Sequence, residues 1–417
     1  MRPGYTAGES AAQQPDEGTF AQTSASLAAA SGICEQLKNW LLDDAYAVWW
    51  KHGADHVHGG FHERLRLDGD ATGEPRRSRL HPRQIYAFSI ADELGWSGPW
   101  EQAVQHGLDF FVAHYRRPDH LYRALVAPDG AVLSDQAVLY DQAFALLGFA
   151  YAYDVTDDEE LRQSARDLHD QLRSQLANPV AGSEESQPRM LPLLANSHMH
   201  MFEASLAWMD LDHDPRWRLL AEEIRDLALT RFIDSGHGFV REFFNSDWQP
   251  QSGIEGQIVE PGHLFEWGWL LLRWADRASD PDARRIGLNL VDLGEACGVD
   301  PVRGVAITAI LADKRIRDAQ ARLWPQTERI KAACIAAETT HQQRYWNIAA
   351  DAAHGLLKYL DTPLRGLWRD KMNPDGTFVE EPAPASSFYH IVCAIAELEH
   401  TLKRCSRGAA VDVAAPR

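Results

Sequence analysis

The segment HLFEWGWLLLRWA, His263 to Ala275, has the length of a helix and carries large apolar side chains on more than one side of it. A second segment, LYDQAFALLGFAYAY, Leu139 to Tyr153, has the same character. A helix that is apolar on several sides has to be covered on all of them. We therefore expect such helices to form an inner layer, with other helices packed around them.

Apolar residues spaced three and four apart predict helices through most of the remaining chain. Strand signals are few and short, so the fold class is all-α. Because no Pro-, Gly- or Ser-rich linker divides the helices, we expect one domain, a toroid of two concentric helix layers. A helical solenoid is the competing arrangement, but no fixed-period repeat supports it. The further predicted helices include residues 26–50, 100–115, 158–176, 215–233, 341–360 and 386–404.

The predicted domain covers residues 26–405. Residues 1–25 are rich in small and polar side chains and lack the apolar core of a signal peptide, so they are predicted to be a disordered leader. Residues 406–417 are predicted to be a flexible tail. Two stretches with period-two character that contain Asp-Gly, residues 59–70 and 121–133, are predicted to be small hairpins in loops between helices.

The composition excludes several classes of partner. A formal net charge of −19 and a pI near 5.4 disfavour nucleic acid and anionic membrane surfaces, which bind concentrated Lys and Arg. No apolar run is long enough to span a bilayer. The five cysteines are scattered without CxxC spacing, which favours neither a disulfide framework nor a zinc site. We expect a soluble, cytoplasmic protein, either a monomer or a homodimer.

The stretch HMHMFEA, His198 to Ala204, raises the question of a metal site. On a helix, residues three apart share a face and residues two apart do not, so His200 and Glu203 point together while His198 points elsewhere. The HExxH spacing that places two histidines on one helical face is absent. We therefore expect no metal here, and an acid/base or purely structural role remains.

The His-x-x-Glu spacing returns as His263 and Glu266 in EPGHLFEW, where Pro261 marks the first turn of a helix. The helix dipole disfavours a protonated imidazole at this end, so the sequence predicts a neutral His263, as a general base requires. His390 also stands near the start of an apolar helix, after the predicted caps Ser386 and Ser387.

The sequence has 18 histidines, most of which are expected to be solvated or hydrogen-bonded without a catalytic role. Aromatic and carboxylate neighbours distinguish His200, His263 and His390 from the others. Aromatic faces combined with carboxylates and amides are typical of carbohydrate sites. Arg83 and Glu328 are charged residues beside apolar runs, where a charge is costly without a partner. For both, a functional role is favoured over a structural one.

Taken together, these motifs resemble the N-acylglucosamine 2-epimerase superfamily, from about Gly59 to Ala394. The resemblance rests on EPGHLFEW, NSHMHMFEA, the arginine of RQIYAF, LYDQAFALL, WPQTERIKA and the late YHI. It implies an (α/α)6 barrel with a deep central pocket, a small monosaccharide substrate, and neither a metal nor a redox cofactor. No P-loop pattern is present, so no ATP requirement is expected.

The resemblance also implies site residues. His200, His263 and His390 are the expected catalytic histidines, and Arg83 is expected to hold substrate hydroxyls near the reacting carbons. Glu203 and Glu266 are expected to orient or tune two of the histidines. The residues expected to line the pocket are Tyr140, Asn196, Trp324, Gln326 and Glu328.

The chemistry implied is ring opening, abstraction of the C2 proton and stabilisation of an enediol. His390 is assigned as the base between C2 and C1, His263 as the acid/base for ring opening, and His200 as the group that polarises oxygen; the first two roles could be exchanged. The sequences LYDQAFALL and WPQTERIKA are more similar to the mannose isomerase branch of the family. We therefore expect isomerisation of D-mannose to D-fructose, with related aldoses such as D-lyxose as further substrates.

Three alternatives stay open. A sugar 2-epimerase would return the proton to C2 from the opposite face. A glycoside hydrolase would need two carboxylates across the scissile bond, for which Glu203, Glu266 or Glu328 could serve, although the three histidines argue against it. A non-catalytic sugar-binding protein would need no pair of His263 and His390.

Overall fold

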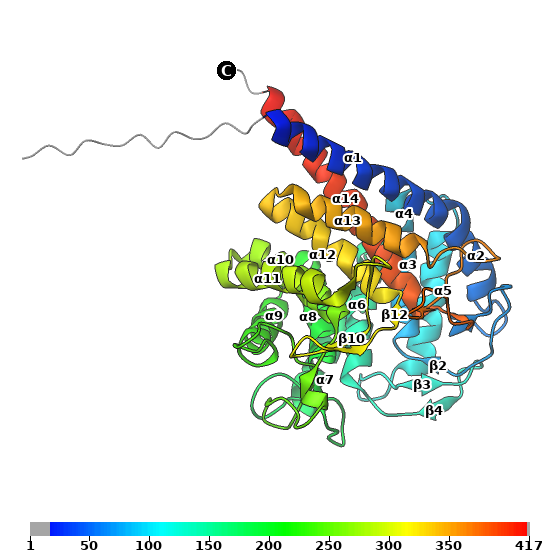
Figure 1. The fold of residues 1–417 in the computed structure, drawn as a ribbon. Helices are drawn as coiled ribbons and strands as arrows, with labels where there is room; N and C mark the ends of the chain where they lie inside the picture. Colours follow the sequence, from blue (N-terminus) through cyan, green and yellow to red (C-terminus); the bar gives the residue numbers. More distant parts are fainter. Residues whose placement is uncertain (1–16, 415–417) are drawn as a thin grey trace, which may run out of the picture.

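The computed structural model describes the backbone of residues 17–414 and the side chains of residues 25–406. Within this part of the chain, six helices form a closed inner ring (Figure 1). Each contacts the next in chain order, and the last contacts the first. In order, they are α3 (Leu80–Ser89), α6 (Leu139–Thr156), α8 (Ala195–Leu211), α10 (Pro261–Ala278), α12 (Trp324–Thr340) and α14 (Ser386–Ala414).

A second layer of helices covers this ring from outside. α5 packs on α3, α7 on α6, α9 on α8, α11 on α10 and α13 on α12, while α1 packs against both α13 and α14. The predicted (α/α)6 barrel is therefore confirmed, and the closed ring excludes a solenoid. The outer helices are α1 (Glu17–Trp40), α5 (Trp100–Tyr115), α7 (Glu159–Gln175), α9 (Pro215–Leu227), α11 (Pro281–Gly298) and α13 (Gln343–Leu357).

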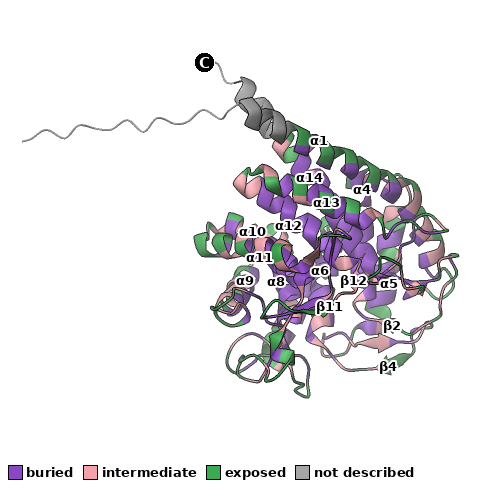
Figure 2. Ribbon diagram, in the orientation of Figure 1, coloured by how far each residue is buried: buried purple, intermediate pink, exposed green. Residues whose placement is uncertain are grey.

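The two layers differ in how their side chains are buried, as the sequence predicted (Figure 2). Inner helix α6 is buried without a break from Asp141 to Ala150, so it has no solvent face there. Outer helix α7 buries only a stripe, Leu161, Ala165, Leu168 and Leu172, which is the spacing of one helical face. Burial on all sides thus separates inner from outer helices.

Short antiparallel strands connect the helices, and one of them comes directly before each inner helix. The predicted hairpin at 121–133 is confirmed, because β3 pairs with β4. The predicted hairpin at 59–70 is confirmed in its second half, where Leu65 pairs with Ala71 across a turn at Gly69; β1 also pairs with β14, from the other end of the chain. The strands are β1 (Arg64–Leu65), β2 (Arg76–Arg77), β3 (Leu125–Val126), β4 (Val132–Ser134), β5 (Leu193–Leu194), β6 (Phe243–Phe244), β7 (Ile258–Val259), β8 (Val299–Asp300), β9 (Val305–Ala306), β10 (Ala309–Leu311), β11 (Ile316–Asp318), β12 (Ala321–Arg322), β13 (Lys371–Met372) and β14 (Ala383–Pro384).

The helical region is longer than the predicted domain, 26–405. α1 begins at Glu17, inside the predicted leader, and α14 continues to Ala414, through most of the predicted tail. The rest of the leader, residues 1–16, and residues 415–417 lie outside the described residues. Among the helices that are described, none is both long and apolar enough to cross a membrane. The remaining helical turns are η1 (Leu41–Ala45), α2 (Tyr46–Val48), η2 (Trp49–Gly53), α4 (Ala91–Leu94), η3 (Ala228–Phe232) and η4 (Glu255–Gln257).

Candidate active site

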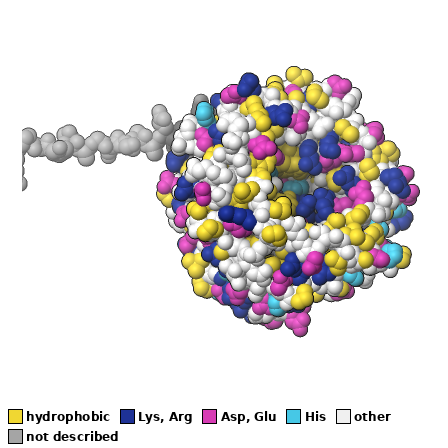
Figure 3. Space-filling view, turned by 90° about the horizontal axis from the view of Figure 1, so that it is seen from below, with side chains coloured by type: hydrophobic (Ala, Val, Ile, Leu, Met, Phe, Trp, Pro, Cys, Tyr) yellow, Lys and Arg dark blue, Asp and Glu magenta, His cyan; other side chains and the backbone are white. Residues whose placement is uncertain are grey.

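A cavity of about 490 Å³ opens at the end of the barrel where the inner helices begin. This volume falls in the range of small-molecule sites, about 300–1,000 Å³. Figure 3 looks onto a hollow in which histidine and Lys/Arg side chains gather. Every inner helix contributes to the lining from its first turns or the residues just before them. The lining residues are Arg77, Arg79, Arg83, Val138, Tyr140, Glu185, Leu194, Asn196, Ser197, His200, Glu260, His263, Glu266, Arg322, Trp324, Ser386, Ser387 and His390.

His263 stands in the first turn of α10, which begins at Pro261 as predicted. Its Nδ1 lies 2.8 Å from an oxygen of Glu242 and 3.7 Å from one of Glu260. Burial alone would lower the pKa of His263, but these two carboxylates outweigh it and raise the pKa to about 10. The prediction of a neutral His263 is therefore wrong, because two adjacent carboxylates outweigh the helix dipole.

His390, in the second turn of α14, has the opposite character. Its Nδ1 lies 2.9 Å from Oε1 of Glu328. Burial, with the nearby cations Arg83 and Lys331, holds the pKa of His390 well below its usual value. His390 is therefore neutral at neutral pH, as a general base must be. The predicted cap Ser387 lies inside α14 and its hydroxyl donates to Asp370 instead.

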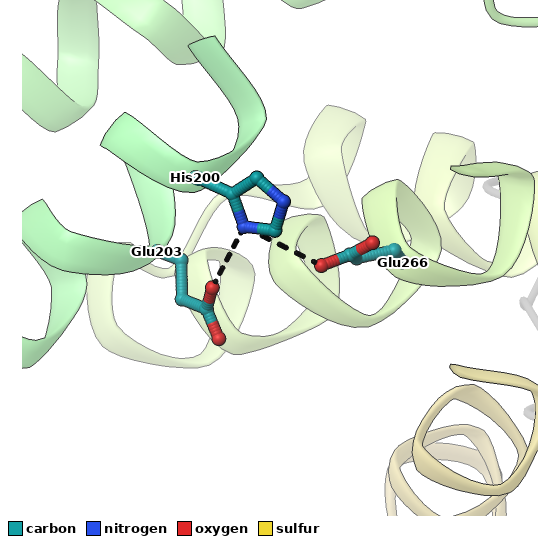
Figure 4. A group of neighbouring side chains, drawn as sticks. All are labelled: His200, Glu203 and Glu266. Atoms are coloured by element: carbon teal, nitrogen blue, oxygen red, sulfur yellow. Dashed lines mark hydrogen bonds and ion pairs between the residues drawn. The ribbon is translucent and has the colours of Figure 1, made fainter. Parts of the chain in front are cut away.

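His200 lies on α8 with its Nδ1 3.2 Å from Glu203 and 3.7 Å from Glu266 (Figure 4). Tyr389 donates its hydroxyl hydrogen to the other oxygen of Glu203. Burial lowers the pKa of His200 to about 4, so this imidazole is also neutral. The predicted pairing of His200 with Glu203 is confirmed. Glu266 was expected to orient or tune a second histidine; it lies near His200 and also contributes to the raised pKa of His263.

His198 points away from the site, as its two-residue offset from His200 predicted. Its Nδ1 lies 3.0 Å from the carbonyl oxygen of Leu194, and its Nε2 accepts from the amide of Ser183. The ring packs edge-on against Trp248. His198 is thus a satisfied core histidine.

Trp324, at the start of α12, lies against both catalytic candidates. Its ring centroid is 5.1 Å from that of His263 and 6.0 Å from that of His390. The indole comes close to the backbone of α10 at Gly262, where an added Cβ would lie 2.4 Å from the ring. The glycine of EPGH therefore makes room for the aromatic wall of the cavity.

Three cavity residues present buried polar atoms that have no hydrogen-bond partner within the described part of the chain: Arg83 through Nε, Asn196 through Oδ1 and Glu266 through Oε1. Arg83 also donates to the Tyr140 hydroxyl at 2.7 Å and stacks 4.0 Å above the Phe144 ring. Buried polar groups are rarely left without a partner, so these atoms are suited to bind a polar ligand.

Three residues of the predicted substrate-binding set, Glu203, Gln326 and Glu328, do not line the cavity. Gln326 uses its amide to bond both backbone groups of Ala306, at 2.7 and 2.8 Å, so the expectation that it lines the pocket is wrong. Glu328 and Glu203 are buried behind the histidines that they hold. Arg83, Tyr140, Asn196, Glu266 and Trp324 do line the cavity.

Several lining or supporting residues were missed. Glu242, which holds His263, lies 21 residues earlier in a loop before β6, and no helical spacing points to it. Arg77, Arg79 and Arg322 also line the cavity, but in the sequence they look like ordinary surface charges. Their position just before two predicted inner helices, in RSRL and RLWP, was the available signal.

Within the described residues, two groups of side chains have a composition that could hold a metal: His200, Glu203 and Glu266, and Glu242, Glu260 and His263. In each group the possible ligand atoms lie within 4.8 Å of one another. In both groups the Nδ1 of the histidine already contacts a carboxylate, and Glu203 also accepts from Tyr389. A metal bound through Nδ1 would have to displace these contacts.

The chain matches known sugar-converting enzymes over most of its length. A model of the N-acylglucosamine 2-epimerase family (GlcNAc 2-epimerase) matches residues 59–394. A mannose-6-phosphate isomerase of Rhizobium meliloti (strain 1021) is 46% identical over 376 residues, which are 88% of this chain and 97% of the relative.

Two solved structures share the fold. A cellobiose 2-epimerase from Bacillus thermoamylovorans B4167 has a TM-score of 0.81 at 18% identity and covers 89% of this chain and 100% of its own. A D-mannose isomerase has a TM-score of 0.79 at 19% identity and covers 93% of this chain and 100% of its own.

Proposed function

The chain belongs to the N-acylglucosamine 2-epimerase family and is a sugar isomerase or epimerase, and we propose that it interconverts D-mannose and D-fructose without a metal. One observation carries this proposal. His263, whose pKa is raised, and His390, whose pKa is lowered, lie on either side of Trp324 in a single cavity. One imidazole is thus protonated and the other neutral. Ring opening needs a proton donor, and removal of the C2 proton needs a base.

In this mechanism protonated His263 donates to the ring oxygen as the sugar opens and takes up the O1 hydrogen. It then protonates O1 as the C2 proton is removed, and takes the O2 hydrogen as C1 is protonated. Neutral His390 takes the C2 proton on Nε2, because its Nδ1 is held by Glu328. The resulting cis-enediol is held by Arg83 and polarised by His200, which both line the cavity. His390 then returns the proton to C1, and the product is the ketose.

The difference between His263 and His390 favours isomerisation over epimerisation. An epimerase has to reprotonate C2 from the face opposite to the one it deprotonated, which requires a second base. His263 is held protonated by Glu242 and Glu260, so it has no free lone pair with which to take the C2 proton. His200 is neutral and lines the cavity as well, but in this mechanism it polarises an oxygen. That leaves His390 as the base, which suits transfer between C2 and C1 on one face.

The arginines of the cavity favour a second candidate substrate, D-mannose 6-phosphate. Arg77, Arg79 and Arg322 line the mouth, and guanidinium groups bind phosphate through paired hydrogen bonds. The Rhizobium relative is named for this phosphorylated sugar. Each of the three arginines also pairs with a carboxylate, from Glu63, Asp141 and Asp370 respectively, which reduces the charge left for a phosphate.

Steady-state kinetics with both sugars and two variants test this proposal. The wild type should form ketose from at least one of the two sugars, and His390→Gln should lower kcat by about 10²–10⁴-fold, the usual contribution of a general base. His198→Gln is the matched control, since His198 shares α8 with His200 but faces away from the cavity. Its kcat should stay within about twofold of the wild type, with folding checked by thermal unfolding.

The other outcomes identify the alternatives. Glucose appearing from mannose ahead of fructose would indicate a 2-epimerase. Release of a reducing sugar from a mannoside, with His390→Gln fully active, would indicate a glycoside hydrolase that uses carboxylates. Binding of sugar without turnover in the wild type would indicate a non-catalytic sugar-binding protein.

A further inference from the structure

Lys331 is a buried cation that has no role in the mechanism proposed above. It lies on inner helix α12, one turn after Glu328, and its side chain is 0% exposed. Its Nζ lies 2.6 Å from Oε2 of Glu328 and 3.8 Å from the centroid of the Trp269 ring. Burying an ammonium group without a partner is costly. The ion pair with Glu328 and the cation–π contact with Trp269 offset that cost.

Glu328 connects Lys331 to the catalytic candidate His390. Its side chain is also 0% exposed, and its two oxygens face different partners; the Thr327 hydroxyl additionally donates to Oε1 at 3.4 Å. Oε2 faces Lys331, whereas Oε1 lies 2.9 Å from Nδ1 of His390. Lys331, Glu328 and His390 therefore form a row from the interior of the barrel to the cavity.

We propose that Lys331 is a positioning residue for the isomerisation: it holds Glu328 so that this carboxylate accepts the Nδ1 hydrogen of His390 and leaves the lone pair of Nε2 facing the sugar. This inference rests on the proposed function, in which His390 is the base. Lys331 itself does not line the cavity and acts only through Glu328.

The physical reason lies in the two tautomers of neutral histidine. If Glu328 is ionised it can only accept, so the proton of His390 stays on Nδ1 and Nε2 is a base. If Glu328 is protonated it can donate to Nδ1, and the proton of His390 moves to Nε2, which can then no longer accept one. Burial raises the pKa of Glu328, and Lys331 opposes that rise.

The other titratable groups around Lys331 come from three neighbouring inner helices. Glu203 on α8, Glu266 on α10 and Cys393 on α14 all interact electrostatically with the ammonium. Burial raises the pKa of Glu266 well above its usual value and that of Cys393 to about 12, which favours their neutral forms. Glu203 is occupied by His200 and Tyr389. Glu328 is thus the carboxylate in direct contact with Lys331.

The test compares Lys331→Met with Lys38→Met in the full-length enzyme. Lys38 also forms an ion pair, with Glu399 at 2.5 Å, but it lies on outer helix α1 away from the cavity. Lys331→Met should lower kcat by about 10²-fold or more while KM changes less than about threefold, because the base is lost rather than the binding surface. The acid limb of kcat/KM should move to higher pH. Lys38→Met should change none of these.

A double variant keeps the test valid if Lys331→Met alone folds poorly, since it leaves a carboxylate buried without its cation. Glu328→Gln and the Glu328→Gln/Lys331→Met double variant both remove that charge. If Lys331 acts only through Glu328, the double variant should have the same kcat as Glu328→Gln, and ¹⁵N NMR of labelled histidine should show His390 Nε2 protonated in Lys331→Met and free in the wild type.

The inference is overturned if Lys331→Met keeps the wild-type kcat and acid limb, or if adding Lys331→Met to Glu328→Gln lowers kcat further. A loss of thermal stability with unchanged kinetics would assign Lys331 a structural role and equally overturn it. Failure of the proposed function looks different: the wild type would form no ketose, or His390→Gln would retain full activity.

Discussion

At the scale of single residues, the chemistry depends on the charges placed beside each histidine. His263 has two carboxylates within 4 Å of Nδ1, and His390 has one carboxylate that is itself paired with a lysine. Helical spacing predicted the local pair of His200 and Glu203. It could not predict Glu242, because the position of that residue depends on tertiary contacts of a loop.

The pKa of His263 determines one limb of the expected pH profile. The raised pKa of His263, about 10, keeps it protonated below that pH, so its proposed role as an acid should be lost as the pH rises through about 10. Glu242→Gln removes the closer carboxylate and should move the alkaline limb of kcat/KM about 1–3 units lower. Glu255→Gln, an exposed control, should leave the limb in place. An unmoved limb in Glu242→Gln would show that Glu242 does not govern His263.

At the scale of elements, helix periodicity predicted most helices of both layers, and burial on several sides predicted which of them lie inside. Strand partners were harder to predict. β1 pairs with β14, which lies more than 300 residues later, and such a contact leaves no local pattern in the sequence. The helix beginnings matter most, because every inner helix points its first turns toward the cavity.

The close contact between α10 and α12 gives one prediction at this scale. Gly262→Ala places a Cβ 2.4 Å from the Trp324 ring, so the indole has to move. We expect kcat/KM to fall by up to about 100-fold, as for misplacements of about 1 Å in an active site. Gly32→Ala, where an added Cβ meets nothing within 4 Å, is the control and should behave as wild type. Equal kinetics for the two variants would contradict the proposed role of Trp324.

Gln326 provides a second prediction at this scale, because the structure assigns its amide to the backbone of Ala306 and not to the cavity. Gln326→Leu should lower the free energy of unfolding by about 1–3 kcal/mol, the cost of leaving buried backbone groups unpaired. Its KM should change little. Chemical denaturation and steady-state kinetics on the same preparation check both. A raised KM with unchanged stability would restore Gln326 as a sugar ligand.

At the scale of the whole molecule, the toroid was predictable because a dozen helices with two kinds of burial leave few ways to cover the apolar ones. The closing contact between α3 and α14, residues far apart in the chain, needed the structure. The choice between D-mannose and its 6-phosphate could not be made from the sequence, because the arginines that could bind a phosphate meet at the cavity only in the folded chain.

Removal of metals tests the whole assembly. Dialysis against EDTA should leave kcat within about twofold of the untreated enzyme, because in the proposed mechanism His263 and His390 supply the proton transfers, and both Nδ1 atoms contact carboxylates. Added Mg²⁺, Mn²⁺ or Zn²⁺ should give no increase. Loss of activity on chelation, with recovery on adding one of these ions, would point to the carboxylate–histidine groups as metal ligands.

The most direct measurement is NMR of D-mannose, and in parallel D-mannose 6-phosphate, with EDTA-treated enzyme in D2O, following products and deuterium at C1 and C2. Transfer by His390 on one face predicts the corresponding fructose as first product, with deuterium at C1 to the extent that the transferred proton exchanges with solvent. Glucose labelled at C2 before any fructose appears, or no conversion of either sugar, would contradict the proposed isomerisation.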